Sequence, residues 1–187
     1  FHTYLDPIKA QGTKVLLTIL PNWQHKGMAN MDIEEADRFA DILTYIVDTY
    51  QLDGISFDDE YADYNDYVTN SYSYIIKALH AKLDAKFGTG TKLITVFQWG
   101  NYNQIDATAG AMLDYADHGY FGPNSFESTS SISGMTNNRW MPQAIQLGNS
   151  YNAITLNQIK NRSSQAASGN YGGIMMFNMR RAGDVNP

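Results

Sequence analysis

The sequence has 187 residues, of which 43% are hydrophobic and 17% charged, so it predicts a folded protein of about one domain and excludes a disordered chain. The net charge of −6 and the lack of any Lys/Arg cluster argue against nucleic acid or an anionic membrane as partner. The absence of cysteine excludes disulfides and thiolate metal sites, and no apolar run is long enough to predict a membrane span.

Apolar runs alternate with amphipathic segments along the chain. Residues 1–12 have the pattern of a helix that ends near Gly12. Six apolar runs predict buried strands: 14–20, 52–58, 92–97, 118–122, 143–148 and 172–177. Four stretches predict helices: 36–50, 67–87, 105–116 and 154–168. Asp32 and Glu35 form the pattern of a capping box, and Gly88 stands just past a helix end.

Strands that alternate with helices predict right-handed βαβ units and a parallel sheet. An open doubly wound sheet and a (β/α)8 barrel both fit this order. No GxGxxG or P-loop pattern supports a nucleotide-binding open sheet. Polar and aromatic residues gather where the predicted strands end, which is where a barrel carries its functional groups. The sequence therefore predicts an α/β fold, specifically a (β/α)8 TIM barrel.

The predicted strand count is smaller than a whole barrel requires. A barrel typically has about 250 residues, whereas six strands are predicted here. We expect residues 1–187 to be a single (β/α) barrel catalytic domain with about strands 3 to 8 present, lacking the two N-terminal strands and the last helix. Roughly 60–100 further residues are expected upstream. Expressed alone, residues 1–187 should aggregate or be inactive because two sheet edges would be open; the complete protein should be a monomer.

Five of the 19 acidic residues lie between Asp58 and Asp66, directly after an apolar run. Strand alternation places Ser56, Asp58 and Glu60 on one face, and Asp59 on the other. Two close carboxylates cannot both ionise easily, so one pKa should rise, as a general acid at neutral pH requires. For Asp59 we expect a structural ion pair or hydrogen bond.

Two other interpretations of the acidic cluster are a solvated acidic turn and a metal-binding loop. The EF-hand pattern fails, because Ala62 and Asp63 stand where its glycine should be.

The segment LDGISFDDEYADY, residues 52–64, resembles the DGxDxDxE signature of glycoside hydrolase family 18. More narrowly, it resembles the DGxxFDDEY form of the bacterial endo-β-N-acetylglucosaminidases, which cut the chitobiose core of N-linked glycans. The resemblance continues in order through four further segments: 14–31, 93–100, 115–122 and 172–179. Ser56 departs from the wider family, which has an aspartate there.

The resemblance implies a retaining, substrate-assisted mechanism that proceeds through an oxazoline and needs no cofactor and no metal. Glu60 matches the general acid, and Asp58 matches the residue that orients the substrate acetamide. Tyr120 matches a tyrosine that hydrogen-bonds the same acetamide.

Other residues at the predicted strand ends are candidates for sugar contact. For each, a packing or loop-ordering role is the alternative interpretation. They are Asn22, Trp23, Tyr61, Gln98, Trp99, His118 and Asn178. Asn178 lies near the position where chitinases place a tryptophan, which weakens a chitinase interpretation.

The favoured function is therefore hydrolysis of the chitobiose core of an N-glycan or glycoprotein. The alternatives are a chitinase-like hydrolase and a non-catalytic glycan-binding barrel of a surface glycan-capture system. Retention of both Asp58 and Glu60 favours an enzyme, since a binding protein needs no proton donor. The substrate class implies an extracellular, periplasmic or cell-surface location.

Overall fold

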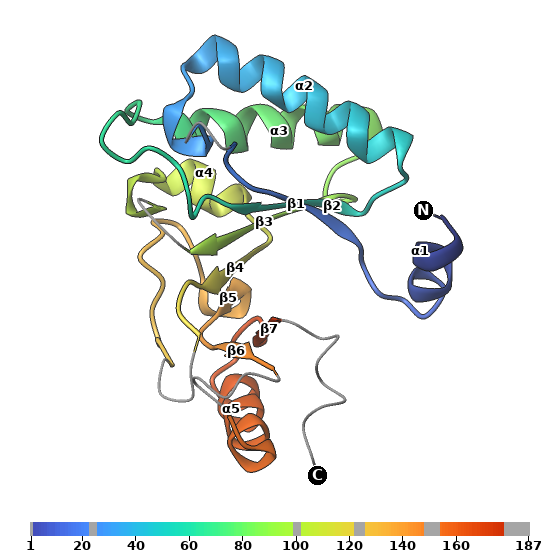
Figure 1. The fold of residues 1–187 in the computed structure, drawn as a ribbon, viewed down its shortest axis with the longest axis vertical. Helices are drawn as coiled ribbons and strands as arrows, with labels where there is room; N and C mark the ends of the chain where they lie inside the picture. Colours follow the sequence, from blue (N-terminus) through green and yellow to red (C-terminus); the bar gives the residue numbers. More distant parts are fainter. Residues whose placement is uncertain (1, 23–25, 99–101, 122–125, 148–153, 178–187) are drawn as a thin grey trace. The chain divides into compact units, whose positions relative to one another are not determined.

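The structure is a computed structural model that describes residues 2–22, 26–98, 102–121, 126–147 and 154–177. The chain divides into two compact units, Phe1–Thr95 and Val96–Pro187. The boundary lies within strand β3, Leu93–Gln98. Each unit is described by itself below, with the labels of Figure 1.

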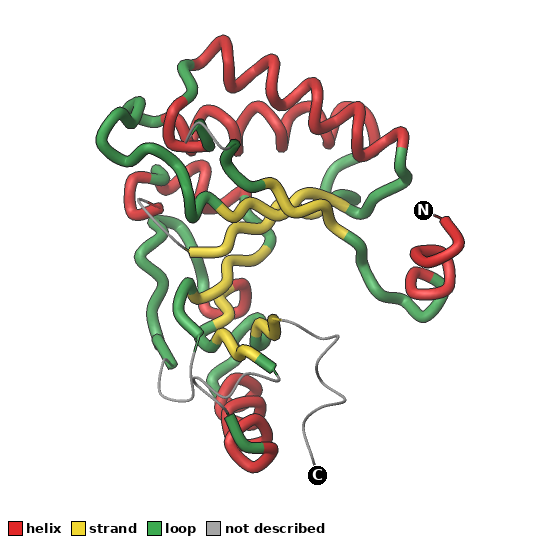
Figure 2. The backbone as a smooth tube through the Cα atoms, in the orientation of Figure 1, coloured by secondary structure: helices red, strands yellow, loops and turns green. Residues whose placement is uncertain are grey.

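The first unit is built of parallel strands covered by two long helices. Strands β1 and β2 pair in parallel, with Leu16 opposite Gly54 and Ile19 opposite Phe57. Helices α2 and α3 lie side by side against this part of the sheet (Figures 1 and 2). The elements are α1 (His2–Lys9), β1 (Leu16–Ile19), the 3-10 turn η1 (Met28–Asn30), α2 (Ile33–Thr49), β2 (Gly54–Asp58), α3 (Ser71–Phe87) and the start of β3.

Burial in this unit follows the helical and strand periods of the sequence. The residues buried on α2 include Ala36, Ala40, Leu43 and Val47, which recur at helical spacing. On β2, Ile55 and Phe57 are buried, while Ser56 and Asp58 are half-buried on the other face. Burial of each large apolar side chain stabilises the fold by about 1.5–3 kcal/mol.

The capping box at the start of α2 is confirmed. The Asp32 side chain accepts a hydrogen bond from Glu35 N at 2.8 Å, and the Glu35 carboxylate accepts one from Asp32 N at 3.0 Å. These contacts satisfy two of the backbone donors that a helix start leaves without partners.

Asp53 and Gly54 join three strands just before β2. Asp53 N donates to Val15 O at 2.8 Å, and Leu93 N donates to Asp53 O at 2.9 Å. Burial raises the pKa of the Asp53 carboxyl, but the Val15 N–H and the Lys9 ammonium outweigh it and hold the pKa below its usual value. A Cβ added at Gly54 would lie 2.0 Å from Leu93 O, so only glycine fits here.

The second unit continues the parallel pattern with shorter strands. Strand β4 pairs with β5, with Ala116 opposite Trp140, and β6 pairs with β7. A bridge between Phe121 and Ala144 extends the β4 pairing past β5. The elements after β3 are η2 (Tyr102–Gln104), α4 (Ala107–Met112), β4 (Tyr115–His118), η3 (Asn137–Arg139), β5 (Trp140–Met141), β6 (Ala144–Gln146), α5 (Leu156–Ser168) and β7 (Met175–Phe177).

The parallel α/β class is confirmed. The strand order is β1-β2-β3-β4-β5 in one sheet and β6-β7 in another, and every pairing whose register is defined is parallel. Strand β6 lies within the strand expected at 143–148, and β5 directly precedes it as a separate strand. Pro142 lies between them, and proline supplies no N–H for a continuous ladder.

Some predicted boundaries are wrong. The strand predicted at 118–122 is instead Tyr115–His118, and the preceding helix stops at Met112 rather than at residue 116. Residues 113–116 carry three apolar or aromatic side chains, which fit either element, and burial of Ala116 in the sheet decides for the strand. Helix α3 begins four residues later than predicted, because Asn70 adopts a left-handed conformation directly before it. Strand β5 was not predicted, since two residues carry no periodic signal.

We predict that Gly54→Ala destabilises the protein by about 3 kcal/mol or more, because the facing atom is backbone and cannot move aside. Gly90→Ala is the matched control, since Gly90 also has a positive φ, of 69°, but nothing lies within 4 Å of the added carbon. It should cost only the left-handed strain of about 1–2 kcal/mol. The midpoints of urea denaturation measure both, and equal losses would contradict the close-approach explanation.

Candidate active site

The two candidate carboxylates lie at the carboxyl end of β2. Asp58 is the last residue of the strand, and Glu60 follows in a turn. The shared face predicted from alternation therefore holds for Ser56 and Asp58, whereas the position of Glu60 is set by the turn rather than by the strand. Both carboxylates are half-buried. This placement brings a partly desolvated acid pair to the edge of the sheet.

The pKa of Asp58 is raised above its usual value. Burial raises the pKa of Asp58 most, the charge of Glu60 raises it further, and a hydrogen bond from the Glu60 backbone N–H lowers it. Among the described residues, its buried Oδ1 atom has no hydrogen-bond partner. Because an unsatisfied buried acceptor costs about 1–3 kcal/mol, this oxygen is suited to accept a hydrogen bond from a bound ligand.

Tyr61 lies beside Glu60. The charge of Glu60 raises the pKa of Tyr61, and a hydrogen bond between the tyrosine hydroxyl and the Glu60 carboxylate raises it further. Tyr61 is 56% exposed. It thus combines a polar contact to Glu60 with an exposed side chain at the same sheet edge.

Asp59 is buried between these two acids in the chain, and it is only 1% exposed. Its Oδ1 accepts a hydrogen bond from Met28 N at 2.8 Å. Its Oδ2 accepts from Ala29 N at 3.1 Å and from the Tyr72 hydroxyl at 2.9 Å. Burial raises the pKa of Asp59 to about 6 against these donors. The structural hydrogen bond expected for Asp59 is confirmed, and it ties β2 to both η1 and α3.

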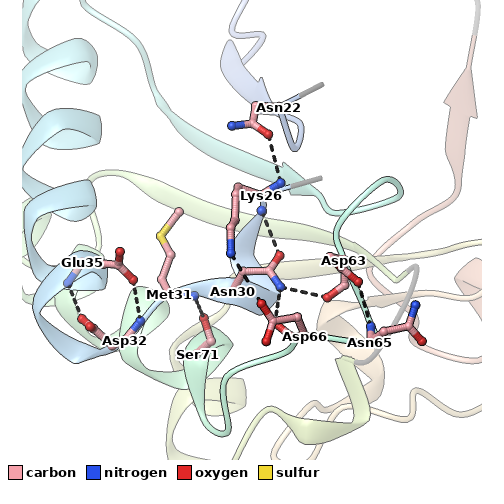
Figure 3. A network of polar contacts seen from close by, with 11 residues as sticks. Asn22, Lys26, Asn30, Met31, Asp32, Glu35, Asp63, Asn65, Asp66 and Ser71 are labelled. Atoms are coloured by element: carbon pink, nitrogen blue, oxygen red, sulfur yellow. Dashed lines mark hydrogen bonds and ion pairs between the residues drawn. The ribbon is translucent and has the colours of Figure 1, made fainter. Parts of the chain in front are cut away.

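Asn30 and Ser71 extend this connection between the loop after β1 and the loop after β2 (Figure 3). The Asn30 amide donates to Asp63 O at 2.8 Å and to Asp66 O at 2.7 Å. The Ser71 hydroxyl donates to Met28 O and accepts from Met31 N. Neither Asn30 nor Ser71 was predicted, because their partners are more than 30 residues away in the sequence.

Asn22 has a loop-ordering role. Asn22 N donates to Lys26 O at 2.9 Å, and the Asn22 side-chain oxygen accepts from Lys26 N at 2.9 Å (Figure 3). Lys26 in turn forms an ion pair with Asp66 at 3.7 Å. The two hydrogen bonds link Asn22 to Lys26, on either side of residues 23–25. Trp23, Trp99 and Asn178 themselves lie outside the described residues.

In the second unit, Gln98 and His118 are the last residues of β3 and β4. The Gln98 side-chain oxygen accepts from the Ser130 hydroxyl at 2.8 Å and from Ser131 N at 3.2 Å, so it orders the loop before η3. His118 is buried, and Tyr120, two residues on, is 63% exposed.

His118 has contacts on both ring nitrogens. Its Nε2 lies 3.0 Å from the Glu127 carboxylate, and its Nδ1 accepts from Tyr120 N at 2.9 Å. Glu127, which sequence reasoning missed, is the one acidic residue of the Gly/Ser/Asn-rich loop, and that isolation was its only signal.

Each described candidate thus lies at or just after the carboxyl end of a strand. The first unit brings Asn22, Asp58, Glu60 and Tyr61 to one sheet edge. In the second unit, Gln98, His118 and Tyr120 lie at or after the ends of β3 and β4. Within the described ranges, no group of three or more His, Cys, Asp or Glu side chains could hold a metal ion. In the same ranges, no helix has the length and apolar character needed to cross a bilayer.

Comparison with known proteins decides the family. The endo-β-N-acetylglucosaminidase EndoS TIM-barrel domain family matches residues 1–151. This chain belongs to that family. Membership confirms the resemblance noted in the acidic motif and the TIM-barrel fold expected from the strand and helix order.

Two relatives of this chain are named as endo-β-N-acetylglucosaminidases. The chain is 31% identical over 186 residues to endo-β-N-acetylglucosaminidase F1 of Elizabethkingia meningoseptica, covering 94% of this chain and 52% of the relative. It is 32% identical over 195 residues to an endo-β-N-acetylglucosaminidase of Flavobacterium sp. (strain SK1022), covering 99% and 58%. The chain therefore spans about half the length of these relatives.

Solved structures show the same fold at lower identity. EndoBT-3987 of Bacteroides thetaiotamicron, solved with a Man5GlcNAc product, aligns with a TM-score of 0.68 at 24% identity over 94% of this chain and 40% of that one. A family GH18 chitinase from the fern Peteris ryukyuensis aligns with a TM-score of 0.70 at 16% identity, over 97% and 72%.

We predict that Asp59→Asn destabilises the protein by about 1–3 kcal/mol at pH 7, because an amide NH2 must face one of the three donors that the carboxylate accepts. The folded-state pKa of about 6 exceeds the usual 3.8, so the folded state binds the Asp59 proton more tightly. Asp59 therefore contributes more stability as pH falls from 7 towards 4.

The difference in unfolding free energy between wild type and Asp59→Asn should widen over this pH range. Denaturation series at several pH values measure it. A difference that stays constant or narrows towards pH 4 would refute the assigned ionisation of Asp59.

Proposed function

We propose that the protein is an endo-β-N-acetylglucosaminidase that hydrolyses the GlcNAc-β1,4-GlcNAc bond in the chitobiose core of N-linked glycans. Family membership and two relatives named for this activity support the reaction class. EndoBT-3987, which shares the fold, has been solved in complex with a Man9GlcNAc2Asn substrate. The acid pair at the end of β2, with an unsatisfied buried oxygen on Asp58, is the observation that carries the proposal.

The proposed reaction uses the substrate's own 2-acetamido group as nucleophile. The acetamide oxygen attacks the anomeric carbon, the glycosidic C–O bond breaks, and Glu60 gives its proton to the leaving oxygen. The leaving group is the GlcNAc that stays on asparagine. The oxazolinium ion forms on the other GlcNAc of the core, which carries the rest of the glycan. Water then attacks the anomeric carbon and loses a proton to Glu60, which restores the acid and opens the ring. Configuration is retained because both steps invert it.

Asp58 is suited to the acetamide. Its buried Oδ1 has no hydrogen-bond partner among the described residues, and a hydrogen bond from the acetamide N–H would satisfy it and orient the carbonyl oxygen towards the anomeric carbon. The nitrogen becomes positive as the oxazolinium ion forms, so a carboxylate beside it stabilises that charge more in the transition state than in the bound substrate.

The other candidate residues have supporting roles in this proposal. Tyr120 contributes a second hydrogen bond to the acetamide, and its exposed side chain leaves it accessible to substrate. Tyr61 contacts Glu60 and presents its ring to a sugar. Asn22 and Gln98 order the loops at the sheet edge rather than meeting the sugar first. Trp23, Trp99 and Asn178 are proposed as sugar contacts on sequence grounds alone.

The substrate class also leads to proposals about setting. N-glycans are attached to secreted and surface proteins, so we propose that the enzyme acts outside the cytoplasm: secreted, periplasmic or on the cell surface. Its role there is in carbohydrate metabolism. When complete, the protein is proposed to act as a monomer on an N-glycan or glycoprotein substrate.

The direct test is to incubate the protein with a high-mannose glycoprotein and weigh the products. Loss of the glycan with one GlcNAc left on each asparagine supports the proposal. An unchanged mass together with measurable glycan binding would favour a non-catalytic binding barrel. Cleavage of chito-oligosaccharides in place of the glycoprotein would favour a chitinase-like enzyme.

Glu60→Gln should keep the fold and glycan binding but lower kcat by about 10²–10⁴-fold, the usual contribution of a general acid. The amide has the size and hydrogen-bonding reach of the acid but cannot give up a proton. Steady-state kinetics and a binding isotherm on the same preparation test this. Near-wild-type turnover would remove Glu60 from its role.

Asp58→Asn should lower hydrolysis of the intact glycan by roughly 10²–10³-fold, the scale of losing one electrostatic stabiliser. The variant should still use a preformed oxazoline donor, because that donor enters after the step in which Asp58 acts. Both rates are measured by mass spectrometry of the products. If the variant used neither substrate, Asp58 would be needed for folding or binding instead.

A further inference from the structure

The carboxyl end of β4 carries a chain of contacts that ends on the backbone of Tyr120. Trp140 on β5 is buried, and its indole N–H donates to Glu127 O at 2.7 Å. Glu127 N donates to Pro142 O at 2.8 Å, so strand β5 and the residue after it hold Glu127 from both sides of its peptide. The Glu127 carboxylate lies 3.0 Å from His118 Nε2. This anchoring gives the imidazole a fixed partner.

The partner on Nε2 decides the neutral tautomer of His118. A carboxylate only accepts hydrogen bonds, so Nε2 carries the proton and donates it to Glu127. Nδ1 is then a bare acceptor, and it takes the hydrogen bond from Tyr120 N at 2.9 Å. The same Nδ1 also lies 3.0 Å from Tyr120 O. A single ring nitrogen therefore faces both polar atoms of one residue's backbone.

We propose that His118 is a positioning residue for Tyr120: its neutral ring holds the Tyr120 N–H, and protonation moves the hydrogen bond to the Tyr120 C=O. This inference rests on the proposed function, in which Tyr120 binds the acetamide. His118 acts through the backbone that carries the Tyr120 side chain and through an edge contact with the Tyr120 ring, whose centroid lies 5.8 Å from that of the imidazole.

The surroundings of His118 determine the direction in which its pKa is shifted. Burial holds the pKa of His118 below its usual value, while the Glu127 charge and the hydrogen bonds to Tyr120 and Glu127 oppose it. Among the described residues, the ionisable groups that face the ring are Glu127 and Tyr120, and β5 contributes the indole of Trp140. Asp117 lies on the opposite face of β4 by strand alternation. At neutral pH the ring is therefore uncharged and holds the Tyr120 N–H.

Loss of the contact between His118 and Tyr120 N should reduce turnover because the Tyr120 side chain is then misplaced. His118→Leu removes both the donor and the acceptor, and misplacement of a substrate-orienting group should lower kcat by about tenfold to a hundredfold. His118→Gln keeps an amide oxygen for Tyr120 N and an NH2 for Glu127, so it should recover most of that loss.

A double-mutant cycle with Tyr120→Phe separates positioning from general structural support. If His118 acts through the Tyr120 hydroxyl, His118→Leu should cost little further activity in the Tyr120→Phe background. An equal factor in both backgrounds would overturn the proposal. Thermal denaturation of each variant accompanies the kinetics, and if His118→Leu does not fold, an NMR titration of the wild-type protein tests the contact instead.

The contact has a readout that does not depend on activity. In a pH titration followed by NMR, the Tyr120 amide should move with the same midpoint as the His118 ring, below the usual 6.5. Glu127→Gln removes the charge that raises this pKa, so the midpoint should fall further. A Tyr120 amide that ignores the His118 titration would overturn the proposal whatever the activity. A wild-type protein that shows this titration but cleaves no glycan would count against the proposed function instead.

Discussion

The buried carboxylate of Asp59 is the interaction on which the rest of the acidic edge depends. A charge withdrawn from water is costly, and here three donors from two other elements offset that cost. The backbone of Asp59 is thereby fixed, and with it the directions in which Asp58 and Glu60 leave the chain. Gly27 makes the approach possible, since a Cβ there would lie 2.2 Å from Asp59 Oδ1. The first three acids of the cluster are therefore not a solvated turn: Asp59 is a buried anchor, and Asp58 and Glu60 on either side of it are the candidate catalytic acids.

The parts of the fold that the sequence predicts are those with a local or periodic signal. Alternation along β2 and the helical spacing on α2 follow from the burial of one face, and the Asp32–Glu35 capping box is complete within four residues. Strand β5 escapes prediction because its two residues become a strand only through pairing with β4. The start of β4 escapes for a similar reason: residues 113–116 suit a helix until burial in the sheet excludes it.

The candidate site divides in the same way. A strand end followed by acids is visible in the sequence, so Asp58 and Glu60 could be found there. The donors on Asp59 come from residues about 30 positions earlier, and Glu127 reaches His118 only through folding. For Asn22 and Gln98 the residue type suggested sugar contact, whereas the structure gives both loop-ordering bonds: Asn22 bonds Lys26, four residues on, and Gln98 bonds Ser130, 32 residues on. A polar residue at a strand end is thus easy to locate, and its partner is not.

The connection through Asn30 and Ser71 bears on how such a domain can be altered. The loops after β1 and β2 share buried hydrogen bonds, so neither is an independent module. A loop exchanged alone, for instance to change which glycan is accepted, would leave polar groups of the other without partners inside the protein. Successful grafts should carry both loops as a matched pair. Variation between relatives at this edge should accordingly be correlated across two segments that are far apart in the chain.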